Sequence, residues 1–269
     1  MGESRGEEWT LTQSSGRNTA AIVTGAILTL IMVVFLFREE ESQDLITLLT
    51  VLGPVVSLAL GMLGMNLFGK DSIGRGDGFM TFGLWLSMGL LVLTLAEIAG
   101  VVLGLAGGQD YTFFTIGLMQ MPGFMLWGIG IIGYLKSVSQ SIDMVHSERL
   151  WPILVSVMVM GSLVLVALAM SLFPDQSILM ILVGAPTFLW FLIASILVGG
   201  LLWVFREGFL ARPMAILLIG VMICLIRGIL WLTTDQSQFD VIDDFLAIES
   251  YFAVGAALSE AARLRIMDS

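Results

Sequence analysis

The chain alternates between long apolar stretches and short polar connections. Eight of the stretches approach or exceed the roughly 20 residues needed to span the hydrocarbon core of a bilayer. They lie at 19–37, 45–69, 79–107, 112–135, 151–173, 178–205, 213–233 and 241–262. Because backbone polar groups in lipid must be satisfied within their own segment, all eight are predicted to be helices. The last is the least apolar, since it holds Asp243, Asp244 and Glu249.

Composition supports an all-α integral membrane protein. Hydrophobic residues fill 57% of the 269 positions and charged residues only 13%, which is typical of chains embedded in membrane lipid. The polar ends form cytoplasmic tails at 1–18 and 263–269, which flank a transmembrane domain at 19–262. With 12 Lys and Arg against 22 Asp and Glu, no surface for nucleic acid is expected.

Basic residues lie almost entirely on one side of the predicted spans. The tails and the even-numbered connections hold Arg5, Arg17, Lys70, Arg75, Lys136, Arg149, Arg206, Arg212, Arg263 and Arg265. The opposite side holds only Arg38, and Arg227 lies within a span. Since Lys and Arg concentrate in cytoplasmic loops, we expect a multi-pass protein of the cell membrane with both termini in the cytoplasm.

The other side is predicted to be acidic. Its residues are Glu39, Glu40, Glu41, Asp44, Asp110, Asp175, Asp235, Asp240, Asp243 and Asp244. Two interpretations stay open. The acids form a vestibule that attracts cations, or they are merely tolerated outside, because acidic residues contribute little to membrane topology.

A weak internal similarity suggests four tandem helical hairpins, each with two spans. Aligning GPVVSLALG, MPGFMLWGIG, APTFLWFLIA and IESYFAVGAA places Pro54, Pro122, Pro186 and Glu249 at equivalent positions, 68, 64 and 63 residues apart. A nearly constant period is the signature of a repeat, and two-span units give parallel copies. The prolines kink their helices and either open a shared outer cavity or only shape the bundle.

Three charged side chains lie deep within the spans: Glu97, Arg227 and Glu249. Each would cost roughly 2.5–3.5 kcal/mol if unpaired, so such residues usually face the bundle and pair. Counted at 1.5 Å per residue, Arg227 lies ~9 Å and Glu249 ~12 Å from the outer ends of their helices. A short connection makes these helices antiparallel neighbours, so Arg227 and Glu249 are the expected pair. Glu97, at ~15 Å by the same rise, is the expected third member.

The three charges allow two interpretations. In one, Arg227 and Glu249 form a buried ion pair that locks the last hairpin. In the other, one arginine between two carboxylates forms a site, with Gln120 and Tyr251 nearby, and the excess negative charge holds a proton or a cation.

Signatures of catalysis and of cofactors are scarce. The lysines, Lys70 and Lys136, stand at the inner ends of spans, which argues against a retinal Schiff base. One histidine and one cysteine, His146 and Cys224, offer no bis-His haem or zinc site. The GRGD segment at 74–77 fits the GxGD pattern of intramembrane aspartyl proteases and resembles the prepilin peptidases in its place at the start of a span. A second aspartate at the same depth is missing, and that chemistry requires two carboxylates.

These features predict a non-enzymatic protein without cofactor or metal. Its main predicted function is that of a transporter or small-ligand receptor, with a small polar or cationic ligand bound near the outer face. The alternative is a structural or accessory subunit that packs with partner membrane proteins, and the third is the aspartyl protease. A closed, water-free ion pair would favour the accessory subunit, and an outer cavity reaching Glu97 would favour transport or sensing.

Overall fold

The computed structural model describes residues 3–37, 42–75, 78–105, 109–141, 150–174, 177–233 and 240–268. Within these ranges the chain forms eight α-helices and no strand. They are α1 (Glu3–Phe37), α2 (Ser42–Arg75), α3 (Gly78–Leu105), α4 (Gln109–Ser141), α5 (Leu150–Leu172), α6 (Ile178–Val204), α7 (Ala211–Thr233) and α8 (Asp240–Asp268). The predicted all-α class is confirmed for the described residues.

Seven of the described helices, α1 to α7, are long and apolar enough to cross a membrane. This supports a multi-pass membrane protein. The helix α8 is not in this set, because acidic residues, among them Asp243, Asp244, Glu249 and Glu260, dilute its hydropathy. The count of eight crossings and the hairpin repeat stay predictions.

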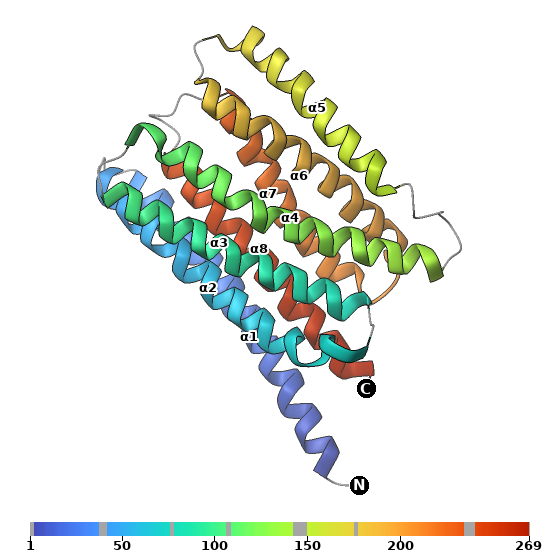
Figure 1. Ribbon diagram of the computed structural model, residues 1–269. Helices are drawn as coiled ribbons and strands as arrows, with labels where there is room; N and C mark the ends of the chain where they lie inside the picture. The colour runs from blue at the N-terminus through green and yellow to red at the C-terminus, as the bar shows by residue number, and fades with distance from the viewer. Residues whose placement is uncertain are drawn as a thin grey trace.

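The helices form an antiparallel bundle in which each runs opposite to its neighbour in sequence (Figure 1). Both chain termini lie at one end of the bundle, here called the terminal end. The opposite end, where α1, α3, α5 and α7 finish, is called the distal end. Short connections explain this arrangement, since helices joined by a few residues pack antiparallel.

The polar helix α8 occupies the middle of the bundle. It packs against α1, α2 and α7, and every residue from Val254 to Ala262 is buried. By contrast, α5 packs mainly on α6 at the edge of the bundle (Figure 1). A helix surrounded by other helices can carry polar groups if its neighbours supply partners, so the partners of the α8 acids locate the polar chemistry of this protein.

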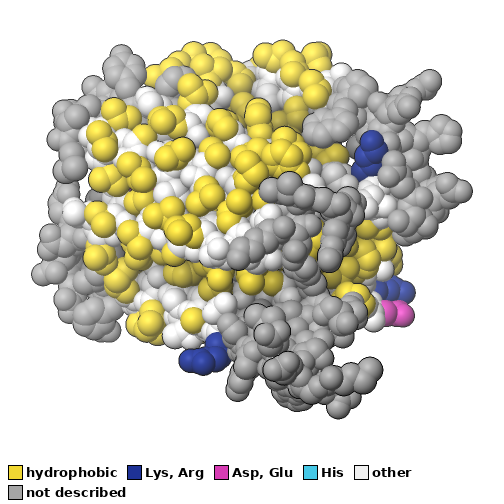
Figure 2. Space-filling model, turned by 60° about the horizontal axis from the view of Figure 1, so that its bottom comes forward, with side chains coloured by type: hydrophobic (Ala, Val, Ile, Leu, Met, Phe, Trp, Pro, Cys, Tyr) yellow, Lys and Arg dark blue, Asp and Glu magenta, His cyan; other side chains and the backbone are white. Residues whose placement is uncertain are grey.

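The outer surface is largely hydrophobic. Figure 2 shows apolar side chains spread over much of one face, with Lys and Arg side chains near its margins. The helices α1 and α5 contribute large exposed side chains such as Leu28, Leu163 and Leu172, at 60%, 61% and 69% exposure. So broad an apolar surface is unusual for a soluble monomer and is suited to contact with lipid.

Close helix contacts depend on glycines at the crossings. A Cβ added to Gly89 on α3 would lie 2.9 Å from the backbone oxygen of Gly123 on α4. Beside this contact, Trp127 Nε1 donates to the backbone oxygen of Leu86 at 3.0 Å. On α7, a Cβ at Gly228 would lie 2.8 Å from Cα of Phe188 on α6. These contacts hold the helices that position the polar residues described next.

Candidate functional site: an ion pair beside a carboxylate cluster

Arg227 on α7 forms a bidentate ion pair with Asp243 on α8. Its Nε and Nη2 atoms each donate to an Asp243 carboxylate oxygen at 2.8 Å. Trp231, one turn further along α7, donates from Nε1 to the same carboxylate at 2.7 Å. The Arg227 and Asp243 side chains are only 4% and 7% exposed. Three donors on one buried carboxylate give the pair the geometry that a desolvated ion pair requires.

The expected pairing of Arg227 with Glu249 is wrong. A Cβ built on Gly220 of α7 would meet Ala253 of α8 and, on the side that faces α7, Ser250 and Val254. Asp243 lies on that side, seven and eleven residues before these two positions. At 100° per residue, Glu249 lies about 120° away from Asp243 around the helix. A prediction from depth in the membrane alone therefore chose the wrong carboxylate. The angular position of each acid around the α8 axis determines which one reaches α7.

Glu249 stands apart from this pair. It is partly buried, and its Oε1 atom is buried with no hydrogen-bond partner among the described residues. Of the five side chains that the sequence groups as a site, Glu249 therefore belongs neither to the ion pair of Arg227 nor to the second polar group described next.

Glu97 on α3 is the centre of a second polar group. Its Oε1 atom accepts a 2.5 Å hydrogen bond from the Tyr251 hydroxyl on α8 and a 3.1 Å bond from Gln120 Nε2 on α4. Tyr251 is fully buried and Gln120 is 2% exposed, whereas Glu97 keeps partial exposure. The structure thus brings together three of the predicted side chains, Glu97, Gln120 and Tyr251, at the convergence of α3, α4 and α8.

The helix α2 lies against this group and also binds a further carboxylate, that of Asp244 on α8. A Cβ added to Gly53 would lie 3.2 Å from Glu97 Oε2. One turn away on the same face of α2, Thr50 donates to Asp244 Oδ2 at 2.8 Å. Three residues along a helix correspond to ~4.5 Å of rise. Glu97 of α3 and Asp244 of α8 therefore contact α2 at positions one turn apart and lie near each other. We call Glu97, Gln120, Tyr251 and Asp244 the carboxylate cluster.

Sequence reasoning missed Asp243 and Asp244. Both were expected on the acidic outer face, yet Asp243 is buried in the ion pair and Asp244 belongs to the carboxylate cluster. The signal that could have found them is two adjacent acids at the start of a helix that continues as an apolar run. Adjacent helical residues point about 100° apart, so the two acids address different neighbours.

Carboxyl groups outnumber cations around the cluster. Arg227 is balanced by Asp243, and the other described cations, Arg17, Lys136, Arg206, Arg212 and Arg263, lie toward the terminal end. Glu97 and Asp244 therefore form no ion pair with a described cation. Gln120 Oε1 is also buried without a hydrogen-bond donor in the described part of the chain. The cluster thus presents hydrogen-bond acceptors and more carboxyl groups than cations.

The prolines of the predicted repeat do not enclose a common space. Pro122 is exposed on the surface of α4, and Pro54 and Pro186 are partly buried within α2 and α6. A ring on the outer surface of the bundle cannot line an internal cavity. The prolines are therefore better described as features of helix shape.

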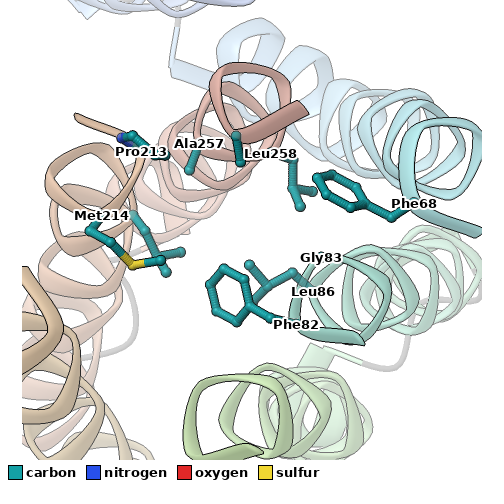
Figure 3. A pocket seen from close by; sticks show the side chains of 10 residues that line it. Phe68, Phe82, Gly83, Leu86, Pro213, Met214, Ala257 and Leu258 are labelled. Atoms are coloured by element: carbon teal, nitrogen blue, oxygen red, sulfur yellow. The ribbon is translucent and has the colours of Figure 1, made fainter. Parts of the chain in front are cut away.

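A small pocket lies instead between α2, α3, α7 and α8, toward the terminal end. Figure 3 shows the side chains of Phe68, Phe82, Met214 and Leu258 around it. The cavity volume is about 10 Å³, roughly the space of one water molecule. Its lining side chains are apolar, so this pocket is not the polar site that the buried charges suggested.

Other predicted features lie outside the described residues. The GRGD segment continues past the end of α2 at Arg75, and residues 76 and 77 are not described. The same holds for His146 and for the acids Glu39, Glu40, Glu41, Asp175 and Asp235 of the predicted acidic face. The acidic face and the GxGD interpretation therefore stay predictions.

No protein-family profile matches the chain, and no curated protein or solved structure is significantly similar to it. The function is therefore argued from the ion pair and the carboxylate cluster.

Proposed function

We propose that this chain is a non-enzymatic multi-pass membrane protein that binds a small polar or cationic ligand at the carboxylate cluster, as a transporter or small-ligand receptor. One observation carries the proposal. Glu97 is partly exposed, forms no ion pair among the described residues, and lies beside Gln120, whose buried Oε1 lacks a donor. Intramembrane ionisable groups usually mark ligand or ion pathways, and this one has acceptors left for a ligand.

The proposal includes eight membrane crossings and an outward-facing cluster. The helix α8 runs antiparallel to α7 through the centre of the apolar bundle (Figure 1). At 29 residues its length is ~43 Å at 1.5 Å per residue, more than a bilayer core requires. With the basic residues assigned to the cytoplasm, the distal end faces outward, and the carboxylate cluster lies in the outer half.

Each of the two interpretations of the buried charges suits a different group: the structural lock suits the ion pair, and the ligand site suits the carboxylate cluster. Arg227 and Asp243 form a closed, almost fully buried pair that joins α7 to α8, which suits a structural lock. Glu97 and Asp244 keep partial exposure, which suits a site. The closed pair is also the observation that favours the second candidate, an accessory subunit that packs with other membrane proteins.

Access of water to Glu97 distinguishes a transporter or receptor from an accessory subunit. The variant Glu97→Cys, made in a Cys224→Ala background, should react with a small, charged, water-soluble thiol reagent applied from outside. Ser87→Cys on the same helix is the matched control, since Ser87 is fully buried and should stay unreactive. Reaction at position 97 alone supports the ligand site. A well-folded Glu97→Cys protein that does not react would exclude aqueous access and favour the accessory subunit.

A further inference from the structure

We infer that the ligand of the carboxylate cluster is a protonated amine, a small cation that donates N–H hydrogen bonds. The inference rests on the proposed function and adds the chemical class of its ligand. It follows from which hydrogen-bonding groups of the cluster are already engaged and which are not.

The hydrogen-bond donors in the cluster and next to it already bind carboxylates of the protein. The Tyr251 hydroxyl and Gln120 Nε2 both donate to Glu97 Oε1, and the Thr50 hydroxyl donates to Asp244. Two nitrogens of Arg227 and the Trp231 indole donate to Asp243. A ligand that needs strong donors from the protein, such as a carboxylate or a phosphate, would have to compete with these bonds.

The acceptors of the cluster are not all engaged. Gln120 Oε1 is buried and has no donor among the described residues. Glu97 uses Oε1 for both of its hydrogen bonds, and its Oε2 atom faces Gly53. An unpaired buried acceptor costs about 1–3 kcal/mol, so a ligand that brings donors to this point is favoured.

The charge and the number of acceptors select an amine. Glu97 and Asp244 supply two carboxylates, and Gln120 supplies a neutral oxygen. Three such oxygens match the three donors of an –NH₃⁺ group. Ca²⁺ and Mg²⁺ take six or more oxygen ligands, and the described residues contain no group of three or more His, Cys, Asp or Glu side chains suited to a metal.

Gly53 lies against the carboxylate of Glu97. A Cβ at this position would lie 3.2 Å from Glu97 Oε2 and 3.6 Å from its carboxyl carbon. A methyl group there would occupy the approach to the oxygen that does not bind Tyr251 or Gln120. Gly53→Ala is therefore a variant that keeps every charge but crowds Glu97 Oε2.

Binding of simple cations to the purified full-length protein tests the inference. Methylammonium, tetramethylammonium and sodium chloride are compared at equal ionic strength, and the unfolding temperature and Kd are measured in detergent. Methylammonium at a hundredfold excess over its Kd should raise the unfolding temperature by about 5–10 °C. Tetramethylammonium has the same charge without donors, so it should have no comparable effect. Equal effects of methylammonium and either other cation would overturn the inference.

Variants locate the effect. Glu97→Gln and Asp244→Asn should weaken methylammonium binding about 10- to 100-fold, the range for a lost hydrogen bond to a charged group. Gly53→Ala should weaken it as well, which keeps the test informative if a charge variant does not fold. Glu249→Gln is the matched control and should bind as wild type. Undiminished binding by all three cluster variants contradicts the inference, whereas reaction of Glu97→Cys without any amine preference contradicts only the ligand class.

Discussion

At the scale of single residues, Arg227 shows how this protein holds a guanidinium within an apolar bundle. Its charge meets a carboxylate through two parallel hydrogen bonds, and its guanidinium carbon lies 5.6 Å from the centre of the Trp231 ring. The same tryptophan donates to Asp243. Arg227, Trp231 and Asp243 therefore act as a unit, and removing one member leaves the others with unsatisfied polar groups.

We predict that Arg227→Met strongly destabilises the protein and that Asp243→Leu in the same chain restores part of the loss. Breaking a buried ion pair on one side costs about 3–5 kcal/mol, because the remaining charge is left unpaired. Replacing both members removes that charge. The measurement is thermal and chemical unfolding in detergent for both single variants and the double variant.

The control for this cycle is Glu249→Gln. Because Glu249 does not reach Arg227 in the structure, combining Glu249→Gln with Arg227→Met should give additive losses. Additive losses for Arg227→Met with Asp243→Leu would instead contradict the ion pair.

The composition of the carboxylate cluster was partly predictable at this scale. Glu97 and Tyr251 could be placed at related depths from the positions of their spans. Polar groups within a membrane are expected to pair, because an unpaired polar group in lipid is costly. The identity of the arginine partner was not predictable from depth. Glu249 shares a helical face with Ala253 and Ala256, and small residues made that face look buried. Asp243 was assigned to the acidic outer face because it stands at the outer start of its predicted span, next to a polar connection.

At the scale of helices, the sequence predicts which segments are helical better than it predicts which helices pack together. Length and apolar content identify α1 to α7 because a bilayer tolerates few alternatives to a helix. Short connections then make sequence neighbours antiparallel, but they do not decide how strongly two helices pack. The structure packs α1 mainly against α8 and much less against α2. The packing of α1 against α8 joins the two ends of the chain, and no local sequence pattern in either helix predicts it.

We predict that Gly228→Ala destabilises the packing of α7 on α6. The added methyl would meet the backbone of Phe188 at 2.8 and 2.9 Å, and backbone atoms cannot move aside as a side chain can. Overpacking typically costs about 1–3 kcal/mol, so the unfolding temperature should fall by several degrees. Gly133→Ala and Gly199→Ala are matched controls, since a Cβ at either position meets nothing within 4 Å. Equal losses in the variant and both controls would show that helix propensity or lipid contact decides the outcome.

At the scale of the whole molecule, orientation links the charge distribution to the site. The cluster lies in the distal half of the bundle, whereas the described cations other than Arg227 lie toward the terminal end. If basic residues mark the cytoplasm, the distal half faces outward, and the proposed ligand would reach Glu97 from outside. The same assignment requires that α8 cross the membrane, although its acids keep it below the hydropathy of the other seven helices.

We predict that a cysteine at Ser177 is labelled on intact cells, whereas cysteines at Gly208 and Met267 are not. Ser177 and Gly208 are exposed residues at opposite ends of α6, and position 267 lies at the end of α8. In a Cys224→Ala background, a membrane-impermeant maleimide reports which sites face outward. Eight crossings place positions 208 and 267 on the same, cytoplasmic side, and both should be labelled only after permeabilisation. Labelling of position 267 on intact cells would mean that α8 does not cross, and the cluster would then lie between a membrane bundle and a helix packed on it from one side.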